Sequence, residues 1–338
     1  MKGASEWGSV RKIRSLTQIM ALLEAASRSR KEYQDDVRES LVKQHIVLER
    51  ARQRGSQTGY RPFEQIRSGL HALTEDNLSF LKRMSFAKEI NGKLVLSADS
   101  RRLLDEWRKD DIAKVRKLVI RRLLLSPYKA YISYLQNMKR IGGSFRVRAR
   151  GEKRTRASRL RQRLHDLGFE TDVASFYTIR DLFYDLKLLN TVTDMRGRFE
   201  TIFLTSVLTG ASTRLGEFSS SIRVGRFRLH FDRKITDPDF CKHVVEGYKT
   251  ISRTWSRWVS LIILRNVVVH QLRISDEDFN TLMEKVNLRG GCDGFKVDGS
   301  TGYRVSRRQY GLVLKSMRMP LTTGGRPIQY VAVSRLKS

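Results

Sequence analysis

Cysteine is nearly absent from this chain of 338 residues, which contains only Cys241 and Cys292. Two cysteines can form one disulfide at most, and they cannot supply the ligands of a cysteine-rich zinc site. So little cysteine is typical of a protein in a reducing compartment. We therefore expect an intracellular location, in a cytoplasm, a nucleoid or a nucleus.

Long apolar runs are lacking as well. The longest apolar stretch, from Trp258 to Leu272, is interrupted by Arg265 and Asn266 and falls short of the roughly 20 residues that a membrane-spanning helix needs. The N-terminal sequence MKGASEWGSVRKIRS contains no apolar core of the kind that signal peptides have. These absences predict a protein without a secretory leader and without a membrane partner.

Acidic residues are scarce relative to basic ones: 35 Asp and Glu stand against 66 Lys and Arg, a formal net charge of +31 at pH 7. Hydrophobic residues make up 40% of the chain, so the charge belongs to a folded protein and not to a disordered basic tail. Like charges repel one another in a compact fold, and a polyanionic partner offsets that repulsion. We expect this partner to be double-stranded DNA, with RNA as the alternative and with other protein subunits of a nucleoprotein complex as further candidates.

Motifs for cofactors and metals are missing too. The histidines are scattered without a ligand pair at helical spacing, and no glycine-rich loop precedes Lys-Ser or Lys-Thr, so we expect no cofactor, no metal and no nucleotide-driven motor. The string FDRK over residues 231–234 has a carboxylate two residues before a lysine, as in some nucleases, but such strings are common. The sequence favours a non-enzymatic protein.

Periodicity predicts a mainly helical α+β fold. Apolar residues recur at helical spacing from Val10 to about Arg54. Residues 62–73 and 74–86 then read as two helices, residues 87–97 as a hairpin around Asn91-Gly92, and residues 98–107 as a further helix. This order is expected of a winged helix, in which a helix-turn-helix is followed by a β-hairpin wing.

The same order recurs in the middle of the chain. Residues 126–143, 157–168 and 172–189 read as helices, and residues 190–207 as strand, turn and strand around Gly197. In the last third we predict helices over 258–272, 275–288 and 307–317, a hairpin over 294–306, and a Gly-Gly turn into a strand over 321–333. The pattern resembles tandem winged-helix DNA-binding proteins. We predict a first unit with N-terminal helices (1–110), a basic arm with a second unit (111–235), and a C-terminal α+β unit that is a candidate third winged helix (236–338).

A dense basic strip runs from Lys139 to Arg163, where eleven residues are basic and Glu152 alone is acidic. The arginines of SFRVRARG (144–151) alternate, which on a strand places them along one edge, and those from Arg156 to Arg163 recur at helical spacing. Arginine forks match phosphate oxygens, so the strip is interpreted as an arm that binds nucleic acid. With a second patch near the C-terminus, the predicted nucleic-acid-binding residues are Arg140, Arg146, Arg148, Arg150, Lys153, Arg154, Arg156, Arg159, Arg163, Arg304, Arg307 and Arg308.

The segment TIRDLFYDLKLL (178–189) contains a basic, an acidic, an aliphatic and an aromatic residue and then Tyr184. About ten residues of it resemble the segment that carries the nucleophilic tyrosine in the catalytic winged helix of topoisomerase VI A subunits. The resemblance implies that Tyr184 attacks a phosphate while Arg180 stabilises the developing charge. That family also needs a metal-binding acidic domain, for which Asp237 and Asp239 are the only downstream match. The alternative reading places Tyr184 on a recognition helix, as a core or groove-facing side chain.

Taken as a sequence, the chain predicts a non-enzymatic protein that binds double-stranded DNA in transcription, replication, partition or a DNA-handling complex. Recognition helices are expected near residues 74–85 and 172–189, with basic arms and wings on phosphates. Two alternatives stay open: a DNA-cleaving tyrosine transesterase that uses Tyr184, and an RNA-binding structural subunit of a ribonucleoprotein.

Overall fold

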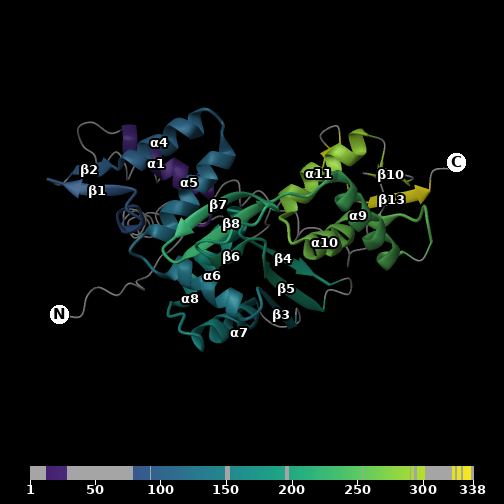
Figure 1. The fold of residues 1–338 in the computed structure, drawn as a ribbon, viewed down its shortest axis with the longest axis horizontal. Coiled ribbons are helices and arrows are strands. Elements are labelled where there is room, and N and C mark those ends of the chain that lie inside the picture. The colour runs from purple at the N-terminus through teal and green to yellow at the C-terminus, as the bar shows by residue number, and fades with distance from the viewer. Residues whose placement is uncertain are drawn as a thin grey trace, which may run out of the picture. The chain divides into compact units, whose positions relative to one another are not determined.

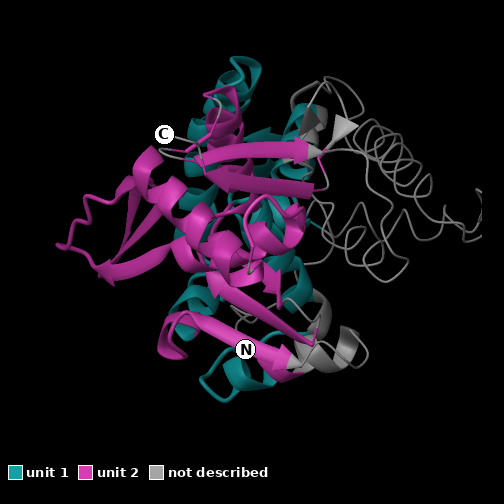
Figure 2. Cartoon of the chain, turned by 90° about the vertical axis from the view of Figure 1, so that its right-hand side faces the viewer, with its two compact units in different colours: residues 1–137, 161–186 teal, residues 138–160, 187–338 magenta. Residues whose placement is uncertain are grey.

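The computed structural model describes residues 13–28, 79–91, 93–148, 153–194, 198–252, 254–289, 291–292, 295–300, 322–323, 326–328 and 330–335. Helices alternate with small antiparallel sheets, which confirms the α+β class (Figure 1). The chain divides into two compact units (Figure 2). Unit 1 contains residues 1–137 and 161–186, and unit 2 contains residues 138–160 and 187–338. The division into segments 1–110, 111–235 and 236–338 that the sequence suggests stays a prediction.

Unit 1 contains α1 (Leu16–Arg28), in which Leu16, Ile19, Met20 and Leu23, apolar residues at helical spacing in the sequence, are buried, as is Ile13 just before the helix. The predicted hairpin is confirmed: β1 (Ala87–Ile90) pairs antiparallel with β2 (Lys93–Leu96), and Asn91 has the positive φ of 50° that such a turn needs. The predicted recognition helix of this segment is helical over 79–83, while residues 74–78 and the predicted helix 62–73 lie outside the described residues.

Three further helices start in unit 1 at capped positions. Ser97 caps α4 (Ala98–Arg108), Asp111 caps α5 (Ile112–Leu125) and Asp172 caps α8 (Val173–Asp185), each by accepting a hydrogen bond from a backbone N–H of the first turn. Helix α6 (Ala130–Arg140) is followed by Gly142 and Gly143, whose positive φ values are typical of a glycine that ends a helix.

The core of unit 1 is aromatic. The ring of Tyr134 on α6 lies 5.6 Å from Phe169, 5.8 Å from Phe176 and 5.5 Å from Phe183, measured between ring centroids. The face of α8 that was predicted to be apolar is fully buried, with 0% exposure of Ile179, Leu182, Phe183 and Leu186. This burial, and not helix propensity alone, fixes which side of α8 is turned away from solvent.

Unit 2 contains a three-stranded antiparallel sheet with the order β3-β5-β4. Its strands are β3 (Ser144–Arg148), β4 (Leu189–Thr193) and β5 (Phe199–Leu204). Pairing of β4 with β5 confirms the strand, turn and strand predicted around Gly197. A carboxylate oxygen of Asp194 accepts hydrogen bonds from the backbone N–H groups of Arg198 and Phe199 at the start of the second strand. Helix α7 (Lys153–His165) follows β3 along the chain.

A second sheet in unit 2 was not predicted. Its strands are β6 (Val207–Gly210), β7 (Phe218–Val224) and β8 (Phe227–Arg233), in the order β6-β8-β7 (Figure 1). Helix α9 (Asp237–Ile251), which follows, was also missed, although Thr236 caps it and Pro238 lies in its first turn.

The C-terminal part of unit 2 packs helices beside a third small sheet. Its helices are α10 (Leu261–Leu272) and α11 (Asp276–Leu288), and its sheet has the order β10-β13-β9, from β9 (Val259–Ser260), β10 (Phe295–Ser300) and β13 (Tyr330–Arg335). The strands β11 (Thr322–Thr323) and β12 (Arg326–Pro327) pair antiparallel, and the predicted Gly-Gly turn lies outside the described residues. Within the hairpin predicted over 294–306, β10 is a strand that pairs with β13, and residues 301–306 lie outside the described residues, so the hairpin stays a prediction. The predicted helix 307–317 lies outside the described residues.

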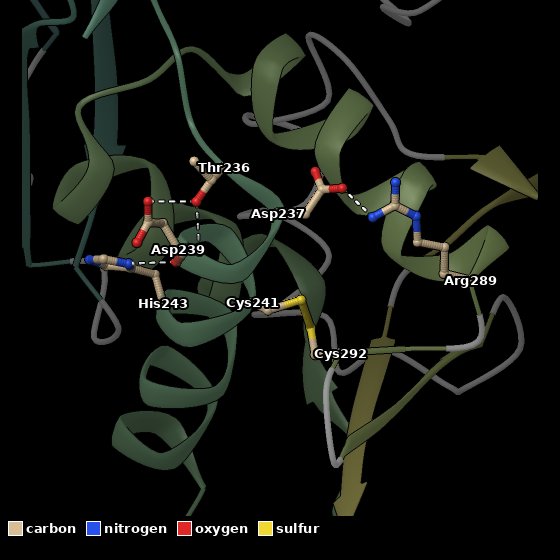
Figure 3. Close-up of a disulfide and its surroundings, with 7 residues drawn as sticks. All are labelled: Thr236, Asp237, Asp239, Cys241, His243, Arg289 and Cys292. Atoms are coloured by element: carbon tan, nitrogen blue, oxygen red, sulfur yellow. Dashed lines mark hydrogen bonds and ion pairs between the residues drawn. A yellow bond between two sulfur atoms is a disulfide. The ribbon is translucent and has the colours of Figure 1, made fainter.

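Close packing and one disulfide hold this region together. At Gly247 on α9 a Cβ atom would meet side-chain atoms of Leu264, Val267 and Val268 at 3.3 Å, so the two helices approach closely. Cys241 on α9 forms a disulfide with Cys292, with 5.4 Å between their Cα atoms (Figure 3). Disulfides persist mainly in oxidising compartments, so the intracellular location stays a prediction.

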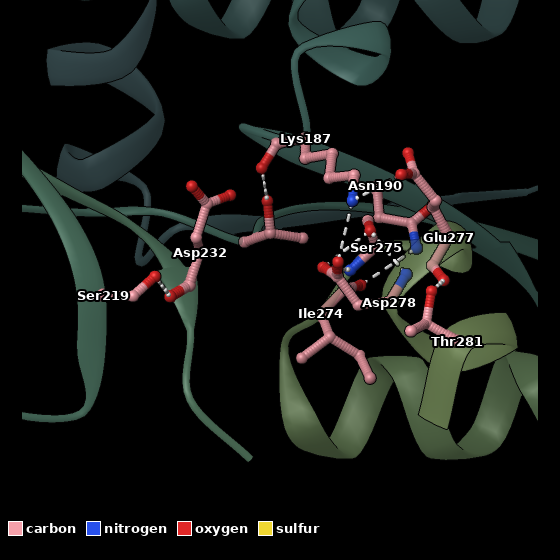
Figure 4. A network of polar contacts seen from close by, with 10 residues as sticks. Lys187, Asn190, Ser219, Asp232, Ile274, Ser275, Glu277, Asp278 and Thr281 are labelled. Carbon is pink, nitrogen blue, oxygen red and sulfur yellow. Dashed lines mark hydrogen bonds and ion pairs between the residues drawn. The ribbon is translucent and has the colours of Figure 1, made fainter. Parts of the chain in front are cut away.

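A polar network joins the start of β4 to the N-terminus of α11. The Nζ atom of Lys187 lies 2.9 Å from a carboxylate oxygen of Glu277 and 2.9 Å from one of Asp278 (Figure 4). The buried amide of Asn190 donates to the carbonyl of Ile274 and to the carboxylate of Asp276. Ser275 caps α11 through a capping box with Asp278, at the start of the helix predicted over 275–288.

Candidate nucleic-acid interface

The basic strip begins on β3, an edge strand of the first sheet in unit 2. Val147 is buried, while Arg146 points to solvent and its guanidinium carbon lies 4.2 Å from the centroid of the Phe199 ring on β5. In the register of the sheet, Arg148 is paired with Phe199. The cation–π contact favours this position of the Arg146 guanidinium over the Phe199 ring.

The strip continues into α7, which is amphipathic as predicted. Arg159 and Arg163 are exposed one helical turn apart, and Leu160 and Leu164 are fully buried. Arg161 serves the fold instead, since its Nε atom donates to the carbonyl of Thr171. Of the other predicted residues, Arg140 is the last residue of α6 and is exposed, Lys153, Arg154 and Arg156 belong to α7, and Arg150, Arg304, Arg307 and Arg308 lie outside the described residues.

Arg273 is a functional candidate that the sequence reasoning missed. It follows α10 with a left-handed backbone, φ 55°, and its guanidinium carbon lies 5.0 Å from the centroid of the Phe203 ring on β5. Burial lowers the pKa of Arg273 below its ordinary value, and the nearby charge of Arg233 lowers it further. The Nη1 atom of Arg273 is buried and has no hydrogen-bond partner among the residues that the structure describes.

His270 lies beside the same ring of Phe203, with 5.2 Å between the ring centroids. Burial lowers the pKa of His270 below its ordinary value, and the charges of Arg273 and then Arg146 lower it further. Arg146 of the strip and Arg273 are therefore both close enough to His270 to act on it electrostatically. We call Arg146, His270 and Arg273 the β5 cationic cluster, because Phe199 and Phe203 of β5 support it.

This cluster carries positive charge that no described carboxylate neutralises. Within the described ranges, no ion pair forms at Arg146, Arg159, Arg163 or Arg273. Cations elsewhere in unit 2 are paired, for example Arg233 with Glu217 and Arg289 with Asp237. Arginines without carboxylate partners can pair with an anion instead, and phosphate oxygens match the geometry of a guanidinium.

The residues of the catalytic alternative are arranged differently. Tyr184 is half-buried on α8, next to the fully buried Phe183. The Nη2 atom of Arg180 lies 2.8 Å from a carboxylate oxygen of Asp181, and its guanidinium carbon lies 5.0 Å from the centroid of the Tyr177 ring. Arg180 is thus engaged within its own helix in this structure.

The acidic residues considered for a metal site have structural roles. Asp237 forms an ion pair with Arg289, and the hydroxyl of Thr236 donates to Asp239 at the start of α9 (Figure 3). In the FDRK string, the backbone carbonyl of Asp232 accepts a hydrogen bond from the Ser219 hydroxyl (Figure 4). Among the described residues, no three His, Cys, Asp or Glu side chains are grouped as metal ligands would be.

Comparisons with protein-family models, with curated proteins and with solved structures found no match for this chain. In the part of the chain that the structure describes, every helix is too short or too polar to cross a membrane.

Proposed function

We propose that this protein binds double-stranded DNA with little sequence preference and without catalysis, holding phosphates with the basic strip and the β5 cationic cluster. One observation carries the proposal: exposed arginines continue from edge strand β3 into α7, beside a cluster of cations without carboxylate partners. Unneutralised arginines destabilise a fold through repulsion, and phosphates remove that repulsion.

The order of elements in the middle of the chain supports a winged-helix unit within this proposal. From α6 to β5 the chain runs helix, strand, helix, helix, strand, strand, and the sheet order is β3-β5-β4. This is the arrangement typical of winged helices, in which α8 is the recognition helix and the β4–β5 turn is the wing. In unit 1, the hairpin β1–β2 followed by α4 supports a second such unit.

The surface of α8 fits the role of a recognition helix. Opposite its buried face, Tyr177, Arg180 and Tyr184 are half-exposed and recur at a spacing of three and four residues. Aromatic and arginine side chains of this kind contact base edges and phosphates in grooves.

The test replaces Arg146, Arg148, Arg150 and Arg154 with Ala and measures binding to matched duplex DNA, single-stranded DNA and RNA. Affinity for every duplex sequence should fall about equally, and the salt dependence should become shallower by about 3 to 4 in the slope of log affinity against log salt. The melting temperature should hardly change, because exposed charges contribute little to folding.

The matched control removes four exposed cations that already have carboxylate partners: Lys82, Arg108, Arg289 and Lys296. It lowers the net charge equally and should bind duplex DNA like the wild type. Equal losses of DNA affinity in both variants would mean that the strip contributes only through the net charge of the protein. Tighter binding of the wild type to RNA than to duplex DNA would favour the ribonucleoprotein alternative.

A further inference from the structure

The second sheet of unit 2 ends in a tight, well-defined turn between β7 and β8. Val224 and Phe227 are directly paired, so only Gly225 and Arg226 connect the strands. Gly225 has φ 56°, whereas Arg226 is not among the residues with positive φ, the combination that defines a type II′ hairpin turn with glycine in first position. The turn therefore presents Arg226 at a fixed place, exposed and stacked on the Phe227 ring with 5.0 Å between its guanidinium carbon and the ring centroid.

The neighbouring strand β6 is tied to this turn. The backbone N–H of Ala211, just after β6, donates to the carbonyl of Arg226 at 3.1 Å. In return, the Nε atom of Arg228 donates to the carbonyl of Ala211 at 3.0 Å. The loop that leaves β6 carries Arg214, which is exposed. We call Arg214, Arg223, Arg226 and Arg228 the hairpin tip.

Two of these arginines face each other across the strands. Arg223 on β7 is the direct partner of Arg228 on β8, and Arg228 reaches the hydroxyl of Ser221 at 3.4 Å. Like charges directly opposite in an antiparallel pair destabilise the sheet. A carboxylate at either position would relieve this cost, yet both are arginine.

No carboxylate compensates for the tip within the described residues. Glu217 is the only acidic residue between positions 205 and 231, and it pairs with Arg233 at the opposite end of the hairpin, 2.9 Å away. None of the four tip arginines takes part in an ion pair of the described structure, whereas Lys82, Arg122 and Lys187 do.

We propose that the hairpin tip is a second phosphate-binding surface, which contacts the sugar-phosphate backbone of DNA independently of the basic strip. Arg223 and Arg226 are exposed and would contact phosphate oxygens, while Arg228 is held by Ala211 and Ser221 and keeps Arg223 in place by backbone pairing. The bound phosphates remove the repulsion between Arg223 and Arg228. This inference rests on the proposed DNA-binding function and adds a contact surface that the basic strip does not contain.

The experiment compares R223Q/R226Q with the matched control R108Q/R289Q, which removes two exposed arginines that are already ion-paired with Asp105 and Asp237. Arg228 is left unchanged because its hydrogen bonds belong to the fold. Duplex DNA affinity is measured over a salt series. The tip variant should lose about 2 in the slope of log affinity against log salt, and its affinity at low salt should fall by tenfold or more, while the control should match the wild type.

The melting temperature of the tip variant should not fall, since the substitution removes a like-charge pair. If the wild type binds duplex DNA steeply with salt but the tip variant matches the control, this inference is wrong and the proposed function stands. If the wild type itself binds duplex DNA without a steep salt dependence, the proposed function fails and the tip proposal fails with it. If the double variant loses its fold together with its affinity, the single substitution Arg226→Gln is tested instead. The Arg226 side chain is exposed and forms no ion pair with the described residues, and its removal should still lower the slope by about 1.

Discussion

At the scale of single residues, one hydroxyl separates the two readings of Tyr184. The side chain is half-buried on α8, and Arg180, its expected helper in catalysis, is held by Asp181 at 2.8 Å. Tyr184→Phe keeps the ring and removes only the hydroxyl, a loss of about 0.5–1.5 kcal/mol if one hydrogen bond is broken. We expect DNA affinity to change by about tenfold at most.

The measurement adds magnesium and supercoiled DNA and looks for nicks and for protein attached to a DNA end. Neither should appear with the wild type or with the Phe variant. Covalent adducts formed by the wild type and absent from the variant would establish the transesterase instead.

His270 gives a second prediction at this scale, because its protonation reports on the β5 cationic cluster. Burial, Arg273 and Arg146 lower its pKa, so in the free protein it should titrate below the ordinary histidine value of about 6.5. A phosphate beside Arg146 and Arg273 would offset their charge and raise the pKa of His270. Binding then takes up a proton, and affinity should increase as the pH falls through the window between the free and the bound pKa values.

Side-chain NMR of His270 with and without duplex DNA measures this directly. If the pKa of His270 does not rise when DNA is added, no phosphate lies at the β5 cationic cluster. The variant Arg273→Gln should raise the pKa of His270 in the free protein, since it removes the charge that lowers this pKa more strongly than the other.

Individual residues were predictable where one element decides their environment. The helical period alone identified the buried face of α8 at Ile179, Leu182, Phe183 and Leu186. Arg273 and His270 were not predictable, because their proximity to Arg146 depends on how α10 lies against β5, two elements far apart in sequence. A positively charged residue just after an apolar helix is common, because it interacts favourably with the helix C-terminus. Its position in the sequence alone therefore does not indicate a binding site.

At the scale of elements, strong turn and cap signals decided what could be predicted. Asn91-Gly92 marked the first hairpin, and Ser275 with an acidic first turn marked α11. The strand β7, with the sequence FSSSIRV, was missed because its serines weaken the β signal. Helix α9 was missed although Thr236 and Pro238 are start signals, since this segment was interpreted only through its acidic residues Asp237 and Asp239.

The prediction at the scale of elements concerns the disulfide that joins α9 to Cys292. It closes a loop with a sequence separation of 51 residues. By chain entropy, opening it should lower the free energy of unfolding by about 4 kcal/mol at 25 °C. Denaturant unfolding of the wild type with and without reductant measures the difference.

The double variant C241S/C292S is the control, and reductant should leave its unfolding unchanged. Thiol titration of the denatured, unreduced protein should find no free thiol. Two free thiols and a reductant-independent transition would show that the bond does not form in solution.

At the scale of the whole molecule, the net charge of +31 indicated a polyanionic partner before any element was known. The described structure refines this statement, because paired cations such as Lys187 and Arg289 stabilise the fold while Arg146, Arg273 and the hairpin tip have no carboxylate partner there. Composition could not make this distinction, since an ion pair depends on tertiary neighbours. Only the unpaired fraction of the charge is expected to meet phosphates.

The most direct test of the central claim is the affinity of the wild-type protein for duplex DNA across a salt series. If the basic strip, the β5 cationic cluster and the hairpin tip together neutralise roughly 6–10 phosphates, log affinity should fall with log salt at a slope of about −5 to −9. Sequence should matter little to this slope, because phosphates carry no base identity. A slope shallower than about −2 would contradict the account and leave the positive charge with some other role.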